Sequence, residues 1–306
     1  MQVRAFIVFI ALGLAAGDAG GQGTESPAPA AAAHAIPAPP QTEEAKAALL
    51  EEVLQNLKKS DAAMNVYERV ERLETRKNAG DVVESKVSRV IPAGTGVDHI
   101  ALGPDGKPAN PEVYHAELLK LEKALSWAAN DGHAQHDAYE KQAKKQKERD
   151  DLIDATRTAF LYTLEGTETR AGRVLYKYRL EPNPTYRPTS RMTAIFAKVR
   201  GFVWIDPEAE QMARVEGEVT GDINVGLFLA KIYKGSHFMQ ERYEMLPGLW
   251  MPSFSQYDFD GRKLFSAISV HERTFYREYR RMGTAKEALV SIRAELNKPA
   301  ADGSDP

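Results

Sequence analysis

The chain of 306 residues contains no cysteine, so it can form no disulfide bond and carry no lipid-modified N-terminal cysteine. It also lacks an excess of charge of either sign, because 40 Lys and Arg stand against 43 Asp and Glu. The net charge of −3 shows neither the basic excess of a nucleic-acid-binding protein nor the acidic excess of a disordered tail. We therefore expect a fold stabilised by apolar burial, for which the chain is long enough.

A long hydrophobic run is lacking as well, since the apolar stretch at residues 5–16 is too short to span a bilayer comfortably. It follows Arg4 and precedes small residues, which is the arrangement of a secretory signal peptide and its cleavage site. We expect residues 1–19 to be a signal peptide, and the mature protein to be periplasmic and not lipidated. A retained N-terminal anchor is the alternative. Residues 20–41 are rich in Ala and Pro and predict a flexible linker.

Alternation of apolar and polar residues runs through residues 156–280 and predicts β-strands. The clearest series are Phe160, Tyr162 and Leu164; Val174, Tyr176, Tyr178 and Leu180; and Ile223, Val225, Leu227 and Leu229. Asp260-Gly261 is typical of a two-residue hairpin turn. An earlier strand pair is expected at residues 66–75 and 82–91. About ten strands joined by short turns predict an antiparallel sheet.

Three segments have helical periodicity. Thr42 can cap a helix that extends to about residue 63, whose apolar stripe must lie on something apolar. A helical insert is expected at about 111–156, with a break near residue 131. Its charged second half predicts a solvated helix face or, alternatively, a partner-binding surface. We interpret residues 42–283 as one domain and residues 284–306 as a C-terminal helix and tail.

No residue pattern indicates catalysis or metal binding. His133 and His136 have a spacing compatible with metal ligation on a helix, but further ligands are not evident in the sequence. Asp258 and Asp260 share a strand face beside the expected turn, where solvated carboxylates are more usual than an acid/base pair. We therefore expect no catalytic residue, no metal site and no cofactor.

The last expected strand interleaves basic and aromatic side chains. They are Arg273, Arg277, Arg280 and Arg281, with Phe275, Tyr276 and Tyr279. Such a strip could contact anionic lipid headgroups. The alternative is a solvated final strand whose arginines protect an edge of the sheet from aggregation.

Several motifs within residues 43–280 resemble a known family. They are Gly201-Phe202-Val203-Trp204-Ile205-Asp206, Lys234-Gly235-Ser236 and Gly248-Leu249-Trp250-Met251-Pro252. In an exported chain that begins with an amphipathic helix, they resemble the outer-membrane lipoprotein-sorting proteins (LolA/LolB-like superfamily), especially their secreted bacterial relatives. The resemblance implies an α+β fold with a strongly curved, incompletely closed antiparallel β-sheet, or half-barrel, and covering helices.

The same resemblance implies a non-enzymatic periplasmic binding or carrier protein for lipid or lipoprotein acyl chains. The cavity and lid candidates are Leu50, Leu54, Leu57, Tyr176, Tyr178, Leu180, Trp204, Leu227, Leu229 and Trp250. Core packing is the alternative role of these side chains. An envelope-stress sensor or protein-interaction module on the same scaffold is the alternative function, with an envelope protein as partner. An exported hydrolase with a spatially assembled site is a third. Transient membrane-surface contact is compatible with the carrier, whereas nucleic acid is not an expected partner.

Overall fold

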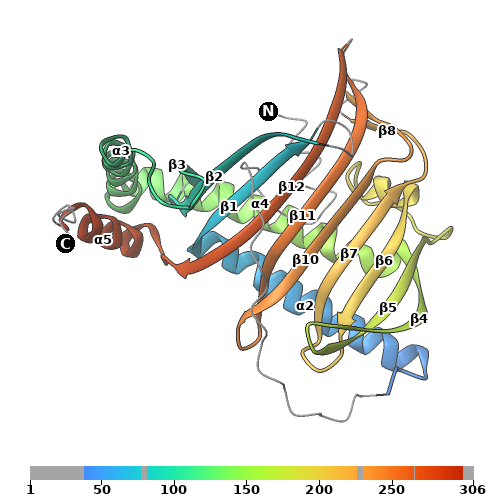
Figure 1. The fold of residues 1–306 in the computed structure, drawn as a ribbon. Coiled ribbons are helices and arrows are strands. Elements are labelled where there is room, and N and C mark those ends of the chain that lie inside the picture. The colour runs from blue at the N-terminus through green and yellow to red at the C-terminus, as the bar shows by residue number, and fades with distance from the viewer. Residues whose placement is uncertain (1–37, 77–80, 95, 226–229, 265, 299–306) are drawn as a thin grey trace.

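The computed structural model describes residues 38–76, 81–94, 96–225, 230–264 and 266–298 (Figure 1). The expected signal peptide and most of the expected linker lie outside this part of the chain. No helix within the described residues is long and apolar enough to cross a membrane. The helices are α2 (Glu43–Ala63), α3 (Pro111–Asn130), α4 (Gly132–Ala159) and α5 (Ala285–Leu296), with 3-10 turns at Met64–Val66 and Thr193–Lys198. The strands are β1 (Tyr67–Arg76), β2 (Val82–Pro92), β3 (Val97–Leu102), β4 (Phe160–Arg170), β5 (Arg173–Pro182), β6 (Val199–Asp206), β7 (Gln211–Val219), β8 (Ile223–Val225), β9 (Ala230–Ile232), β10 (His237–Leu246), β11 (Leu249–Lys263) and β12 (Ser266–Arg281).

The strands form one 12-stranded sheet in the order β3-β2-β1-β12-β11-β10-β7-β6-β5-β4, with β8 and β9 beside β11. Every strand pair is antiparallel. The sheet is curved and open, with β3 and β4 at its two edges (Figure 1). The structure therefore confirms the expected fold class, an open antiparallel sheet with covering helices.

The final strand lies in the middle of the sheet, so the expectation of a solvated edge strand is wrong. β12 pairs with β11 on one side and with β1 on the other, where Glu71 faces Tyr276. Because β1 precedes the helical insert, this pairing joins the strands on both sides of the insert into one sheet. Residues 66–75 and 82–91 do form the expected early pair, as β1 and β2.

The expected turn at Asp260-Gly261 is also wrong, because both residues lie within β11. Gly261 faces Ile232 of β9, and a Cβ atom on it would lie 2.0 Å from the carbonyl oxygen of Lys231. The glycine therefore allows two backbones to approach closely instead of forming a turn. Similarly, the strand expected at residues 223–229 is replaced by the short antiparallel pair β8 and β9, and residues 226–229 lie outside the described part.

Helices α2 and α4 run across the strands on the same face of the sheet, here called the inner face (Figure 1). The Thr42 hydroxyl accepts a hydrogen bond from the Ala45 backbone N–H at 3.1 Å, as expected of a helix N-cap. The apolar stripe of α2 and the last turns of α4 are buried in the main core. An ion pair of 2.7 Å between Lys58 and Asp154 joins the two helices.

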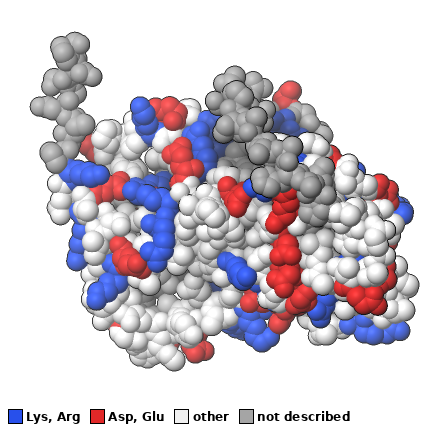
Figure 2. All heavy atoms as spheres, turned by 90° about the horizontal axis from the view of Figure 1, so that it is seen from below, with Lys and Arg blue, Asp and Glu red and all other residues white. Residues whose placement is uncertain are grey.

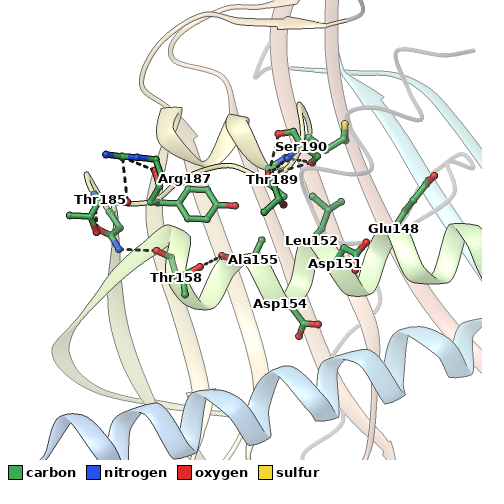
Figure 3. A pocket seen from close by; sticks show the side chains of 14 residues that line it. Glu148, Asp151, Leu152, Asp154, Ala155, Thr158, Thr185, Arg187, Thr189 and Ser190 are labelled. Carbon is green, nitrogen blue, oxygen red and sulfur yellow. Dashed lines mark hydrogen bonds between the residues drawn. The ribbon is translucent and has the colours of Figure 1, made fainter.

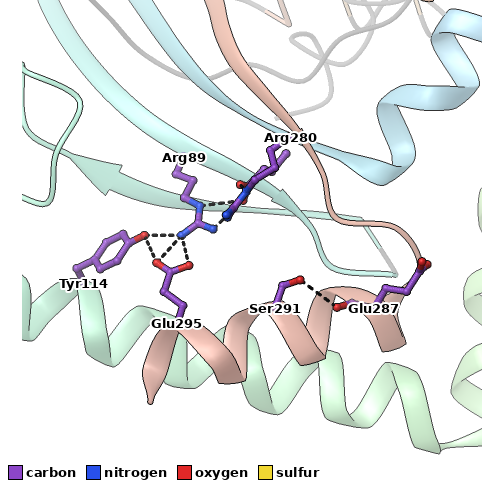
Figure 4. A network of polar contacts seen from close by, with 7 residues as sticks. Arg89, Tyr114, Arg280, Glu287, Ser291 and Glu295 are labelled. Carbon is purple, nitrogen blue, oxygen red and sulfur yellow. Dashed lines mark hydrogen bonds and ion pairs between the residues drawn. The ribbon is translucent and has the colours of Figure 1, made fainter. Parts of the chain in front are cut away.

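Helices α3 and α5 pack together at the β1–β3 end of the sheet over a second apolar cluster (Figure 1). A polar network connects them to the strands (Figure 4). The Arg89 guanidinium of β2 contacts Glu295 of α5 at 2.8 Å and Glu68 of β1 at 2.8 Å, and also donates to the hydroxyl of Tyr114 of α3. Arg280 pairs with the same Glu68. The network thus fixes this helical pair to the sheet.

Candidate functional site

An apolar cavity of about 70 Å³ lies between α2 and the inner face of the sheet. Its lining from α2 is Leu50, Val53, Leu54 and Leu57, and its lining from the sheet and its connections is mainly Phe160, Tyr162, Leu180, Phe196, Val199, Val203, Ile205, Met212, Val215 and Phe238. Thr156, Arg200 and Glu216 add polar groups to the lining. The site is therefore suited to hydrocarbon rather than to chemistry that needs convergent charged groups.

The local sequence explains how this lining is built. Apolar residues of α2 recur at helical spacing, so one stripe faces the sheet. In β6, Val203 and Ile205 point to the inner face, and the residues that alternate with them point to the outer face. β6 therefore contributes to the cavity with its medium-sized side chains.

The candidate residues divide into four groups. Leu50, Leu54, Leu57 and Leu180 line the cavity. Tyr176 and Tyr178 are buried in the same core cluster but do not line the cavity. Leu227 and Leu229 lie outside the described residues.

Trp204 and Trp250 lie in a separate cluster on the outer face, so their assignment to the cavity is corrected. The Trp204 indole N–H donates to Glu168 at 2.7 Å, and both Lys177 and Arg214 lie 4.9 Å from its ring. The Arg173 guanidinium lies 5.2 Å from the Trp250 ring. Because alternation sends Trp204 away from Val203 and Ile205, the tryptophans stabilise the outer face through cation–π contacts and packing.

Sequence reasoning missed most of the cavity lining contributed by the sheet. The missed residues include Val203, Ile205, Met212, Val215 and Phe238. A usable signal was present, because Val203 and Ile205 share one face of their strand and Phe202 and Trp204 share the other. Trp204 was chosen as a ligand contact although it lies on the outer face.

A larger hollow of about 1200 Å³ lies between α4 and the segment at residues 183–193 (Figure 3). Its α4 wall carries the carboxylates of Glu148, Asp151 and Asp154, and Arg187 lies on the opposite wall. Asp151 and Asp154 already pair with lysines. This hollow is more open, and a larger share of its lining is polar than in the cavity beneath α2.

Acidic and basic side chains both occur on the face seen in Figure 2. Among the residues that the structure describes, no group of three or more His, Asp or Glu side chains is arranged to hold a metal ion. His133 is exposed and lies 3.6 Å from Asp137.

Asp258 and Asp260 take part in a hydrogen-bonded cluster on β11 and β12, which differs from the expected turn carboxylates. Asp258 Oδ1 lies 2.9 Å from His271 Nδ1, and His271 Nε2 lies 2.8 Å from Ser269 Oγ. This order of groups resembles a hydrolase triad. However, the Ser269 hydroxyl also donates to Asp260 at 2.7 Å, which directs its proton away from the imidazole. The cluster links the two strands.

No protein-family model and no curated protein matches the sequence. Similar solved structures include a DUF1329 family protein from Desulfovibrio piger, with 10% identity over 76% of this chain and 92% of that chain, and a TM-score of 0.31. A LolA superfamily protein from Nitrosomonas europaea has 10% identity over 76% of this chain and 91% of its own, with a TM-score of 0.30.

A third similar structure is described as an outer-membrane lipoprotein-sorting protein domain from Vibrio parahaemolyticus. It has 12% identity over 81% of this chain and 100% of its own, with a TM-score of 0.33. A shared function does not follow at this level of similarity.

Proposed function

We propose that the protein is a non-enzymatic periplasmic binding or carrier protein that holds acyl chains of lipids or lipoproteins beneath α2. The apolar cavity between the α2 stripe and the inner face is the observation that carries this proposal. Burial of an acyl chain contributes about 0.8 kcal/mol per methylene group. An apolar lining of this kind favours a hydrocarbon ligand over a polar one.

The size of the cavity requires α2 to move when a chain binds. About 70 Å³ accommodates only a few groups the size of water, which is less than a long acyl chain needs. Polar contacts that hold α2 include Lys58 with Asp154 and the Asn56 side chain with the Glu210 carbonyl oxygen at 3.1 Å. Such contacts near the surface contribute little stability each. We therefore propose α2 as a movable lid.

Binding of a fluorescent fatty-acid probe tests this function. In the double variant Leu50→Glu/Leu54→Glu, two carboxylates replace apolar groups of the lining, so probe binding should be lost. The matched control is Ala47→Glu/Ala48→Glu, which places the same charges at two exposed positions near the start of α2 and should bind the probe normally. Circular dichroism checks that both variants fold. Unchanged binding in the folded Leu50/Leu54 variant, or a wild type that binds no probe, contradicts the proposal.

A protein-interaction module is the second candidate function. It is favoured by large aromatic side chains exposed on the helical insert, where Trp127 of α3 is 55% exposed and Tyr139 of α4 is 70% exposed. Such side chains are enriched at protein interfaces. Replacing both with Lys should abolish crosslinking to an envelope protein partner and leave probe binding intact. Loss of probe binding without any change in crosslinking contradicts this second function.

A further inference from the structure

The inner face becomes polar directly beside the apolar cavity. Phe238 of β10 lines the cavity, and the next two residues of that strand on the same face are Gln240 and Arg242. Gln240 is fully buried and Arg242 is 5% exposed. Phe238 and Arg242 are about 13 Å apart along the strand, at roughly 3.3 Å per residue. One extended amphiphile can therefore contact both the cavity and this polar end.

Arg242 is a buried cation without a paired anion. Its Nε donates to the Gln240 side-chain oxygen at 3.2 Å, and its Nη1 donates to the Trp250 carbonyl oxygen at 3.4 Å. Its Nη2 has no hydrogen-bond partner, and it forms no ion pair with a carboxylate of the described residues. The negative charge of Asp61 of α2 attracts the Arg242 guanidinium, but the Asp61 carboxylate is bound to Arg149 at 2.7 Å. A buried guanidinium in this state is destabilising.

A second buried arginine on the same face has a counter-ion within the protein. Arg69 of β1 is as deeply buried as Arg242, and its Nη2 lies 2.5 Å from Oε1 of the buried Glu71. The missing anion at Arg242 is therefore a property of that position. It is not a general feature of the interior.

The neighbouring groups also favour an acceptor-rich ligand. The Gln240 side-chain N–H groups have no acceptor among the described residues. Ser255, with a buried side chain, lies directly opposite Gln240 in β11, and Tyr257 lies opposite Phe238. A carboxylate or phosphate presents several acceptor oxygens and accepts two parallel hydrogen bonds from a guanidinium.

We propose that the ligand is an anionic amphiphile, whose acyl chain fills the cavity and whose carboxylate or phosphate binds Arg242 and Gln240. This inference rests on the proposed function and names the chemical class of its ligand. The bound anion supplies the counter-ion that the described residues of the protein do not provide for Arg242. The acyl chain and the anionic headgroup of the ligand are thus recognised by two adjoining regions of the inner face.

Competition between three ligands with twelve carbon atoms each tests this proposal. Dodecanoate, dodecyl phosphate and dodecanol are each titrated against the bound fluorescent probe. The wild type should bind at least one of the two anions about tenfold or more tightly than dodecanol, as expected of charge-assisted hydrogen bonds. Preference for only one anion identifies whether carboxylate or phosphate is recognised.

Arg242→Met should bind dodecanol as the wild type does and lose the preference for the anion. Arg214→Met is the matched control, because Arg214 lies on the outer face and pairs with Glu216 and Glu241. It should keep the preference. If Arg242→Met does not fold, Gln240→Met should still reduce the preference, because it removes the second donor.

Equal affinity of the wild type for all three ligands overturns this inference and leaves the proposed function standing. So does an Arg242→Met protein that folds and retains the preference. A wild type that binds none of the three ligands refutes the proposed function as well.

Discussion

Gly201 of β6 and Gly217 of β7 face each other across the two strands. A Cβ atom on Gly201 would lie 1.9 Å from the Glu216 carbonyl oxygen, and one on Gly217 would lie 2.5 Å from the Phe238 ring. Gly201 also opens the Gly-x-Val-Trp-Ile-Asp motif. The paired glycines therefore allow close packing of backbone and ring beside the cavity, which explains the glycine of the motif.

Gly201→Ala should lower the free energy of unfolding by roughly 1–3 kcal/mol, because the added methyl group overlaps backbone that cannot move aside. Gly221→Ala is the control, since the nearest atom to its added methyl group is Lys198 Cδ at 4.0 Å. Urea denaturation measures both variants. Equal stability of the two alanine variants would show that the strands can separate at Gly201 without cost.

Arg89→Met should destabilise the protein by roughly 3–5 kcal/mol, because it leaves the buried Glu68 without one of its two arginine partners and removes the ion pair between β2 and Glu295 of α5. In contrast, Arg281→Met removes an ion pair with Glu287 in which the arginine is 59% exposed. It should change stability by no more than about 0.5 kcal/mol. Denaturation in guanidinium chloride compares the two, and a small effect of Arg89→Met is the contradictory outcome.

Alkaline pH should weaken the fold around the cavity. Burial raises the pKa of Tyr162 to about 12, whereas an unfolded tyrosine ionises at about pH 10. Because the folded pKa is the higher one, this contribution to stability is present below about pH 10 and is lost as the pH rises towards 12. Tyr162→Phe should therefore lose about 2 kcal/mol less between pH 9.5 and pH 12 than the wild type. Identical pH profiles of the unfolding free energy for Tyr162→Phe and the wild type would contradict a raised pKa of Tyr162.

Restraint of α2 tests its proposed role as a lid. The chain has no cysteine, so Lys58→Cys/Asp154→Cys provides unique attachment sites for a short bis-maleimide linker between α2 and α4. The crosslinked protein should lose probe uptake, and the unlinked variant should retain it. Lys147→Cys/Asp151→Cys, within α4, is the linked control that should take up probe. Full uptake by the α2–α4 crosslinked protein contradicts a moving lid.

The sequence predicted those elements whose signals are local. Thr42 and the apolar stripe after it identified α2, and alternation identified most strands. The same rules misplaced Asp260-Gly261, because a glycine needed for close approach to β9 looks like a turn glycine in one sequence. They also placed β12 at an edge, because its pairing with β1 depends on residues far away in the chain.

The cavity was predictable in part. The α2 leucines were found because their periodicity shows which side faces the sheet. Trp204 was assigned to the wrong face because its size suggested a ligand contact, although alternation with Val203 and Ile205 held the correct information. The unpaired state of Arg242 could not be predicted from the sequence. It depends on Asp61 of α2 being bound to Arg149 of α4, and these two helices are far apart in the sequence.

Native mass spectrometry of the protein purified from its own cell envelope tests the central claim most directly. The account predicts a wild-type species that carries the mass of one acyl-chain lipid, and its absence in the folded Leu50→Glu/Leu54→Glu variant. A folded wild type that shows only its bare mass, both as purified and after incubation with dodecanoate, would contradict an acyl-chain-binding cavity beneath α2.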